Sequence, residues 1–125
     1  MDKYEAKPFD LVDNKTYKFY ELYINGKSLF RKFLNGIKTG SRDEKTFKGI
    51  ISLMEFFSPS IMLPKTKFRQ IKGTGRKDLF EFKKDDLRIY VVKKSPSIFI
   101  VLGGYKVNQD TDINKLKTTL KEFNL

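Results

Sequence analysis

Any chemistry in this chain must come from side chains whose ordinary pKa values lie far from neutrality. The sequence contains no cysteine and no histidine. This excludes disulfides, thiolate nucleophiles, imidazole acid–base catalysis and zinc sites of the usual kind. No remaining side chain titrates near neutrality unless its environment moves its pKa, so any catalysis would depend on shifted pKa values. Lysine, arginine and tyrosine are the candidates.

Positive charge is concentrated in one part of the chain. Lysine and arginine number 26 against 15 aspartates and glutamates, which gives a net charge of +11 over 125 residues. Between residues 65 and 94 only Asp78, Glu81, Asp85 and Asp86 oppose the cations. A clustered excess of this kind indicates a polyanionic partner. The cations of this segment are Lys65, Lys67, Arg69, Lys72, Arg76, Lys77, Lys83, Lys84, Arg88, Lys93 and Lys94.

The length of the chain fits one domain with its own core. The residues through Asn14 are polar, mixed in charge and without a sustained period, so we expect a flexible arm over 1–14 with no core role, and a single domain over 15–125. No apolar stretch approaches the roughly 20 residues of a membrane span, and no signal region opens the sequence. We therefore expect a cytoplasmic protein with no membrane partner.

Hydrophobic spacing predicts the elements that position these cations. Asn25-Gly26 is typical of a hairpin turn, but the apolar residues after it recur at helical spacing, which favours a helix. Ser41 and Glu44 form a capping box that begins a second helix. The expected strands are 17–24, 68–72, 79–83, 87–94 and 98–105, and the expected helices are 29–37, 41–57 and one capped by Asp110 or Thr111 that runs through Phe123.

These elements predict an α+β fold in the order β-α-α-β-β-β-β-α. The short separators between the later strands favour an antiparallel meander, so we expect an antiparallel sheet of four to five strands. Two N-terminal helices and one C-terminal helix would pack on one face of this sheet, in two layers.

Six short segments in this order resemble the RelE/ParE toxin superfamily, and specifically its phage-associated HigB-like branch. The segments are Asn25-Gly26-Lys27-Ser28, Phe33-Leu34, Arg69-Gln70-Ile71-Lys72-Gly73, Leu79-Phe80-Glu81-Phe82, Leu87-Arg88-Ile89-Tyr90 and Val101-Leu102-Gly103-Gly104-Tyr105-Lys106. Three positions depart from the family pattern: Lys83 stands where arginine is frequent, Leu87 replaces an aromatic residue, and Val107 replaces a second lysine.

The resemblance implies the toxin of a type II toxin–antitoxin pair. Toxins of the RelE and HigB type cleave messenger RNA bound in the ribosome, without a metal or other cofactor, by driving the ribose 2′-hydroxyl onto its neighbouring phosphate. The partners implied are the ribosome, messenger RNA and a cognate antitoxin that covers the basic face. Such chemistry needs a base, cations for the phosphate, a proton donor and an aromatic surface.

The resemblance assigns catalytic roles to three residues. Arg88 would stabilise the phosphate, and the alternative for it is a structural ion pair with Glu81 on the adjacent strand. Lys106 would act as base or charge stabiliser if neighbouring cations lowered its pKa. Tyr105 would stack on a base or supply a hydroxyl.

Five further residues are candidates for RNA binding. Arg69 and Lys72 could follow the RNA backbone, although solvated lysines are common at sheet edges. Arg76 and Lys77 follow two glycines in a turn suited to reaching phosphates. Tyr90 could stack on a base, and the alternative for it is a core residue of a central strand.

Two other functions fit the same residues. A ParE-like gyrase inhibitor would use this scaffold to bind a protein, and a noncatalytic RNA-binding domain could have lost the active residues. The fold does not separate these functions, because one fold supports several activities.

Overall fold

The computed structural model describes residues 2–123. Within this range no helix is long and apolar enough to span a membrane. A short 3₁₀ turn, Lys106–Asn108, precedes the last helix. The helices and strands are β1 (Tyr4–Pro8), β2 (Lys18–Ile24), α1 (Leu29–Asn35), α2 (Arg42–Phe56), β3 (Phe68–Gln70), β4 (Leu79–Lys84), β5 (Leu87–Lys94), β6 (Ser97–Tyr105) and α3 (Gln109–Phe123).

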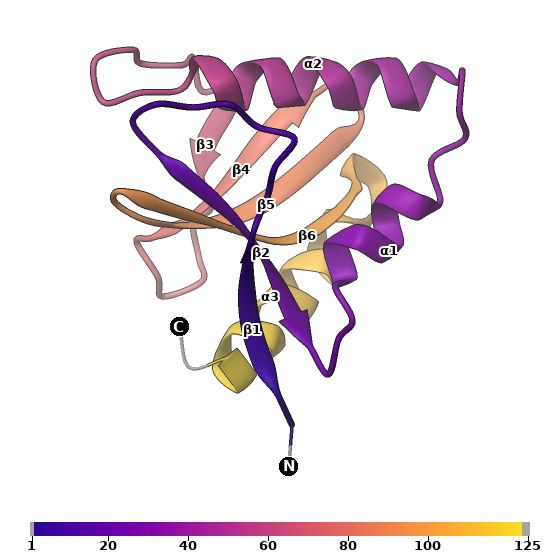
Figure 1. The fold of residues 1–125 in the computed structure, drawn as a ribbon, viewed down its shortest axis with the longest axis vertical. Helices are drawn as coiled ribbons and strands as arrows, with labels where there is room; N and C mark the ends of the chain where they lie inside the picture. The colour runs from indigo at the N-terminus through magenta and orange to yellow at the C-terminus, as the bar shows by residue number, and fades with distance from the viewer. Residues whose placement is uncertain (1, 124–125) are drawn as a thin grey trace.

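Six strands form one sheet in the order β1-β2-β6-β5-β4-β3 (Figure 1). Neighbouring strands are antiparallel, except that β2 and β6 are parallel. The α+β class is confirmed, whereas the prediction of an antiparallel sheet with four to five strands is wrong. The parallel pair joins strands far apart along the chain, and alternation within a strand does not identify a distant partner.

The additional strand, β1, comes from the segment predicted to be a flexible arm. It pairs along its whole length with β2. The next residue, Phe9, is buried and packs edge-on against Phe30, with ring centroids 5.5 Å apart. The Asn14 side-chain amide donates hydrogen bonds to the carbonyls of Met54 and Phe57, at 2.8 and 2.7 Å. The expectation that this segment has no core role is therefore wrong: Phe9 is part of the core, and Val12 packs against it.

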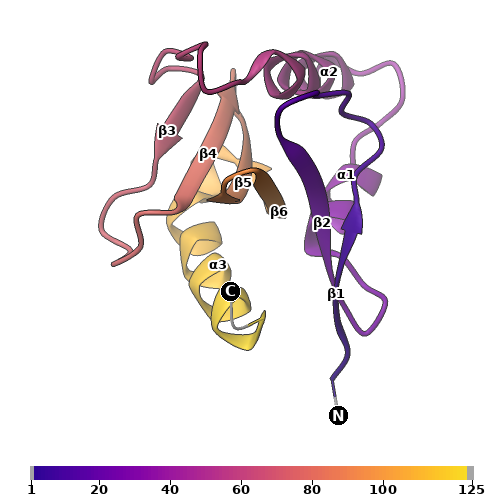
Figure 2. The same cartoon turned by 60° about the vertical axis from the view of Figure 1, so that its left-hand side comes forward.

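Helices cover both faces of the sheet. Phe30 of α1 and Ile50 of α2 belong to the core on one face, which includes Ile89 of β5. Leu116 of α3 belongs to the core on the opposite face, which includes Val92 of β5 (Figure 2). The molecule has three layers, so the prediction of helices on one face in two layers is wrong.

Side-chain caps fix the starts of the first two helices. The Ser28 hydroxyl accepts a hydrogen bond from the Arg31 N–H at 3.0 Å. The Ser41 hydroxyl accepts from the Glu44 N–H at 3.2 Å, and the Glu44 carboxylate accepts from the Gly40 N–H at 3.1 Å. The capping box is thus confirmed, with its return hydrogen bond one residue earlier than in the usual motif.

Candidate functional site

A buried carboxylate, that of Glu81, lies among cations on the α3 side of the sheet. Its side chain is 0% exposed. Arg69 is the register partner of Glu81 on β3, and its Nη2 atom lies 3.5 Å from Glu81 Oε2. Arg88 on β5 brings its Nε atom to 3.5 Å from Glu81 Oε1. One acidic side chain therefore brings together two of the predicted site residues.

The Arg88 guanidinium is held from several directions. Its side chain is 7% exposed, and its Nη1 atom donates to the carbonyls of Asp85 and Leu87, both at 2.8 Å. Its contact with Glu81 is an ion pair without hydrogen-bond geometry. This is the structural alternative considered for Arg88, and it leaves little of the guanidinium for a ligand.

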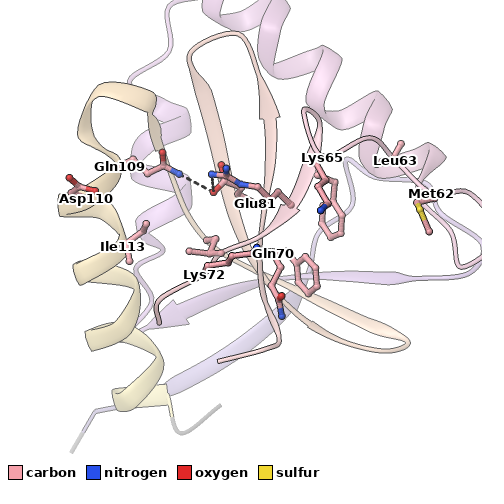
Figure 3. Close-up of a pocket in the computed structure, with 13 residues that line it drawn as sticks. Met62, Leu63, Lys65, Gln70, Lys72, Glu81, Gln109, Asp110 and Ile113 are labelled. Atoms are coloured by element: carbon pink, nitrogen blue, oxygen red, sulfur yellow. Dashed lines mark hydrogen bonds and ion pairs between the residues drawn. The ribbon is translucent and has the colours of Figure 1, made fainter. Parts of the chain in front are cut away.

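The first residue of α3 joins the same group. Gln109 Nε2 donates a hydrogen bond to Glu81 Oε2 at 2.9 Å (Figure 3). A buried carboxylate is costly unless it is paired and hydrogen-bonded. Gln109 therefore helps to satisfy Glu81 and ties the start of α3 to β4.

Lys83 lies two residues beyond Glu81 on β4, on the same face, and opposite Arg88 in the β4–β5 hairpin. Burial lowers the pKa of Lys83; Arg69, Arg88 and Lys106 lower it further, while Glu81 acts in the opposite direction. A lysine in such surroundings has a larger neutral fraction and can accept a proton. We call Arg69, Lys83, Arg88 and Lys106 the cationic cluster, because the charges of the other three all act on Lys83.

Lys106, like Arg69, is an exposed member of the cationic cluster. It begins the 3₁₀ turn between β6 and α3, and its backbone N–H donates to the carbonyl of Asp86 at 2.7 Å. This bond fixes Lys106 beside the turn of the β4–β5 hairpin. Its ammonium is therefore accessible to an anionic ligand next to Lys83.

A groove adjoins the cationic cluster along β3 (Figure 3), with a cavity volume of about 760 Å³. Arg69 and Lys72, both predicted to bind RNA, line it. Its lining is completed by Met62, Leu63, Lys65, Phe68, Gln70, Ile71, Phe80, Glu81, Gln109, Asp110 and Ile113. The groove thus combines apolar side chains with cations.

The two predicted tyrosines lie on opposite faces of the sheet. Tyr90 is fully buried in the core that α3 covers. Burial, followed by the charges of Glu81 and Asp112, raises the pKa of Tyr90. The Tyr105 hydroxyl donates to Asp43 at 3.0 Å on the other face; burial and Asp43 raise the pKa of Tyr105. Tyr90 therefore occupies the core position considered as its alternative, and Tyr105 faces away from Glu81.

The predicted loop cations lie outside the cationic cluster. Arg76 Nε and Nη2 donate to the two carboxylate oxygens of Asp78, both at 2.9 Å. This pairing raises the pKa of Arg76 and lowers that of Asp78. Lys77 is exposed. Arg76 is therefore paired with an acidic residue at this turn, whereas the Lys77 ammonium faces solvent.

Sequence reasoning missed Lys83 and Gln109 as members of the site. A signal for Lys83 was present, because strand alternation places it on the face of Glu81, and the short Asp85-Asp86 turn sets it opposite Arg88. Gln109 carried no local signal, since its role depends on the position at which α3 returns to the sheet.

Within residues 2–123 no group of three or more acidic side chains is arranged to hold a metal ion.

Comparison of the chain with protein-family models, with curated proteins and with solved structures found no match.

Proposed function

We propose that the chain is the toxin of a type II toxin–antitoxin pair and acts as a ribosome-dependent messenger RNA endoribonuclease. The observation that carries this proposal is a lysine of lowered pKa, Lys83, inside a cluster of cations at the end of a groove. Single-stranded RNA offers both the phosphates that such cations bind and a 2′-hydroxyl that a neutral amine can deprotonate. A cognate antitoxin, the ribosome and messenger RNA are the partners of this proposal.

The residues of the cationic cluster suit each step of the reaction. The neutral Lys83 amine takes the proton of a ribose 2′-hydroxyl, and the resulting oxygen attacks the adjacent phosphorus. The bond from phosphorus to the 5′ oxygen breaks, and the leaving oxygen takes a proton from the Lys106 ammonium. The products are a 2′,3′-cyclic phosphate and a 5′-hydroxyl. The Arg69 guanidinium stabilises the charge on the phosphate oxygens. The buried Arg88 pairs with Glu81, and its positive charge helps to lower the pKa of Lys83.

Expression in a bacterial host, with growth and messenger RNA ends followed together, tests the proposal. We expect the wild type to arrest growth and to create new ends inside translated messages, with 5′-hydroxyl termini. Lys83→Met and Lys106→Met should abolish these ends in a soluble protein of unchanged circular dichroism. Lys121→Met is the matched control, because Lys121 lies in the last turn of α3 outside the cationic cluster, and it should behave as the wild type.

The outcome that contradicts the proposal is growth arrest with intact messages, which would redirect the search to gyrase.

A second candidate, a noncatalytic RNA-binding domain, is favoured by the burial of Arg88 in its ion pair with Glu81. This candidate predicts that the purified wild type binds RNA oligonucleotides and programmed ribosomes but cuts neither. Lys83→Met would then weaken binding in a salt-dependent way without affecting any reaction.

A further inference from the structure

β1 is an edge strand of the sheet, and its outer side carries free backbone groups. The register of β1 on β2 continues to Phe9, whose N–H donates to the carbonyl of Phe19 at 2.9 Å. Because alternate residues of an antiparallel strand bond to the same neighbour, the N–H groups of Tyr4 and Ala6 point outward. Within residues 2–123 neither of these N–H groups has an acceptor. An edge of this kind can pair with another strand.

The side chains of β1 are accessible on both faces of the sheet. Tyr4 packs edge-on against Phe123 of α3, with ring centroids 5.2 Å apart, so the even-numbered residues lie on the α3 face. Glu5 and Lys7 lie on the opposite face. Glu5 is half-buried, and the other four residues of β1 are exposed. The Glu5 carboxylate has an ion pair with the exposed Lys3 at 3.6 Å, which contributes little and leaves the carboxylate available.

The order of these side chains is complementary to itself. When two copies of β1 pair antiparallel about a two-fold axis at Ala6, Glu5 of each copy lies opposite Lys7 of the other. Tyr4, which is 38% exposed, then lies opposite Pro8 of the other copy. Opposite charges and an aromatic ring beside an apolar side chain both stabilise cross-strand pairs. The same five residues can therefore form both sides of a two-fold contact.

Charge also disfavours the neighbouring registers of such a pair. Sliding one copy by two residues keeps the backbone pattern, but it sets Glu5 opposite Glu5, or Lys7 opposite Lys7, of the second copy. Like charges directly opposite each other are destabilising. Pro8 has no N–H to donate, so it limits the ladder at that end of the strand. The sequence of β1 thus favours one register, centred on Ala6.

We propose that two copies of this chain associate through β1 and join their two six-stranded sheets into one. The Ala6 N–H of each copy donates to the Ala6 carbonyl of the other, and the Tyr4 N–H donates to the carbonyl of Pro8. β3 lies at the opposite edge of the sheet, so the groove of each copy stays open in the dimer. The inference stands on the free edge and the self-complementary side chains, and it does not depend on nuclease activity.

Sedimentation velocity of the full chain tests the association. A contact of one short strand is small, so we expect a weak, reversible monomer–dimer equilibrium in a concentration series that extends to about 1 mM. A salt concentration of about 0.15 M screens the repulsion between distant cations of the two copies, because the Debye length is then about 8 Å.

A substitution at Ala6 tests the backbone pairing. Ala6→Pro removes an outward N–H and leaves the bonds to β2 in place, so it should weaken the dimer by about tenfold or more while the melting temperature reports a folded domain. Ala6→Ser is the matched control, because it keeps the N–H with a side chain of similar size, and it should associate as the wild type.

Charge reversal tests the register. Glu5→Lys sets lysine opposite lysine and Lys7→Glu sets glutamate opposite glutamate, so each variant alone should associate more weakly than the wild type. A mixture of the two, with one labelled by a fluorophore, should form a heterodimer tighter than either homodimer. The double variant Glu5→Lys plus Lys7→Glu has the net charge of the wild type and should recover its dimer.

Three results would overturn the proposal. A wild type that stays monomeric throughout the concentration series would exclude the dimer. Equal association by folded Ala6→Pro and Ala6→Ser would place the contact elsewhere, and a mixture of the single charge variants no tighter than either alone would exclude this register. All these variants should cleave messenger RNA as the wild type does, because β1 lies at the edge opposite β3. Failure of the dimer is therefore distinguishable from failure of the proposed function.

Discussion

At the scale of single residues, the molecule is organised around ionisable groups that its fold removes from water. The Glu81 carboxylate is fully buried, with arginines on both sides and the Gln109 amide as its hydrogen-bond donor. Asp112 and Tyr90 are buried nearby, and one Asp112 oxygen and the Tyr90 hydroxyl have no hydrogen-bond partner within the described residues. The stability of the domain therefore depends on these few buried contacts.

Removal of Glu81 should destabilise the domain far more than removal of its exposed partner. Glu81→Ala leaves the Arg88 guanidinium buried without its counter-ion, and loss of one partner of a buried pair costs about 3–5 kcal/mol. Arg69, whose side chain is 45% exposed, should cost less than about 1 kcal/mol when changed to alanine. Urea unfolding at neutral pH measures both values. Equal costs for the two variants would contradict this account of the ion pair.

The lowered pKa of Lys83 predicts a pH-dependent cleavage rate. In the proposed mechanism the neutral amine is the active form, so the rate should rise as the pH rises through the pKa of Lys83. Arginine keeps the charge at every accessible pH, so Lys83→Arg should retain RNA binding and lose cleavage by about 100-fold or more. Initial rates on programmed ribosomes across a pH series test this. Cleavage by Lys83→Arg at the rate of the wild type would show that only the charge matters.

Asp112 predicts a pH dependence of stability. Burial raises the pKa of its carboxyl, an effect that Lys115 partly opposes. A raised pKa in the folded state means that this group contributes stability below its unfolded pKa and loses that contribution as the pH rises through the folded value. Asp112→Asn should therefore raise the melting temperature by a few degrees at neutral pH, and the gain should vanish in acid. A gain of the same size at both pH values would argue against titration of Asp112.

At the scale of elements, β1 and α3 are the two segments whose roles depend on distant partners. β1 is the strand at one edge of the sheet, and the buried Phe9 follows it directly. α3 covers the second face and holds Asp112 against Gly104, where a Cβ would collide with the carboxylate. Both terminal segments therefore complete the core. Hydrophobic spacing predicted that α3 packs on the sheet, but it did not show on which face, and the local sequence of β1 did not show its pairing with β2.

A substitution at Phe9 tests the structural role of the N-terminal segment. Phe9→Ala should lower the free energy of unfolding by about 3 kcal/mol, because it removes a buried aromatic side chain from the core. Leu11, at 53% exposed, is the matched apolar control, and Leu11→Ala should change stability by less than about 0.5 kcal/mol. Chemical denaturation of the full chain measures both variants. A Phe9→Ala variant as stable as the wild type would return this segment to the status of a flexible arm.

At the scale of the whole molecule, the net charge of +11 predicts salt-dependent RNA binding. Each cation that neutralises a phosphate contributes roughly 0.7 to the slope of log affinity against log salt for single strands. The double variant Lys83→Met and Lys106→Met should lower that slope by about 1.4, the sum of two contacts. Fluorescence anisotropy with oligouridylate over a range of salt concentrations measures the change. If the double variant bound more weakly but with the same slope as the wild type, Lys83 and Lys106 would not be the residues that contact the phosphates.

The sequence by itself determined those features that depend on neighbours along the chain. The capping box of Ser41, the helical spacing of α2 and the limits of β5 were all predicted, because caps and periodicity act over a few residues. The lack of histidine and cysteine likewise limits the chemistry, because composition is the same in every conformation of the chain. The near-continuous apolar run of β5, Leu87–Val92, also carried a signal of burial on both faces that the two-layer prediction did not use.

Only the tertiary structure decided which distant groups meet. The parallel pairing of β2 with β6, the addition of β1 and the placement of α3 on the second face follow from how the whole chain buries its apolar surface. The same long-range packing makes Arg88 a buried partner of Glu81, brings Gln109 to that carboxylate and lowers the pKa of Lys83. Burial and Coulomb interactions depend on distance in space, and strand alternation or helical spacing does not encode that distance.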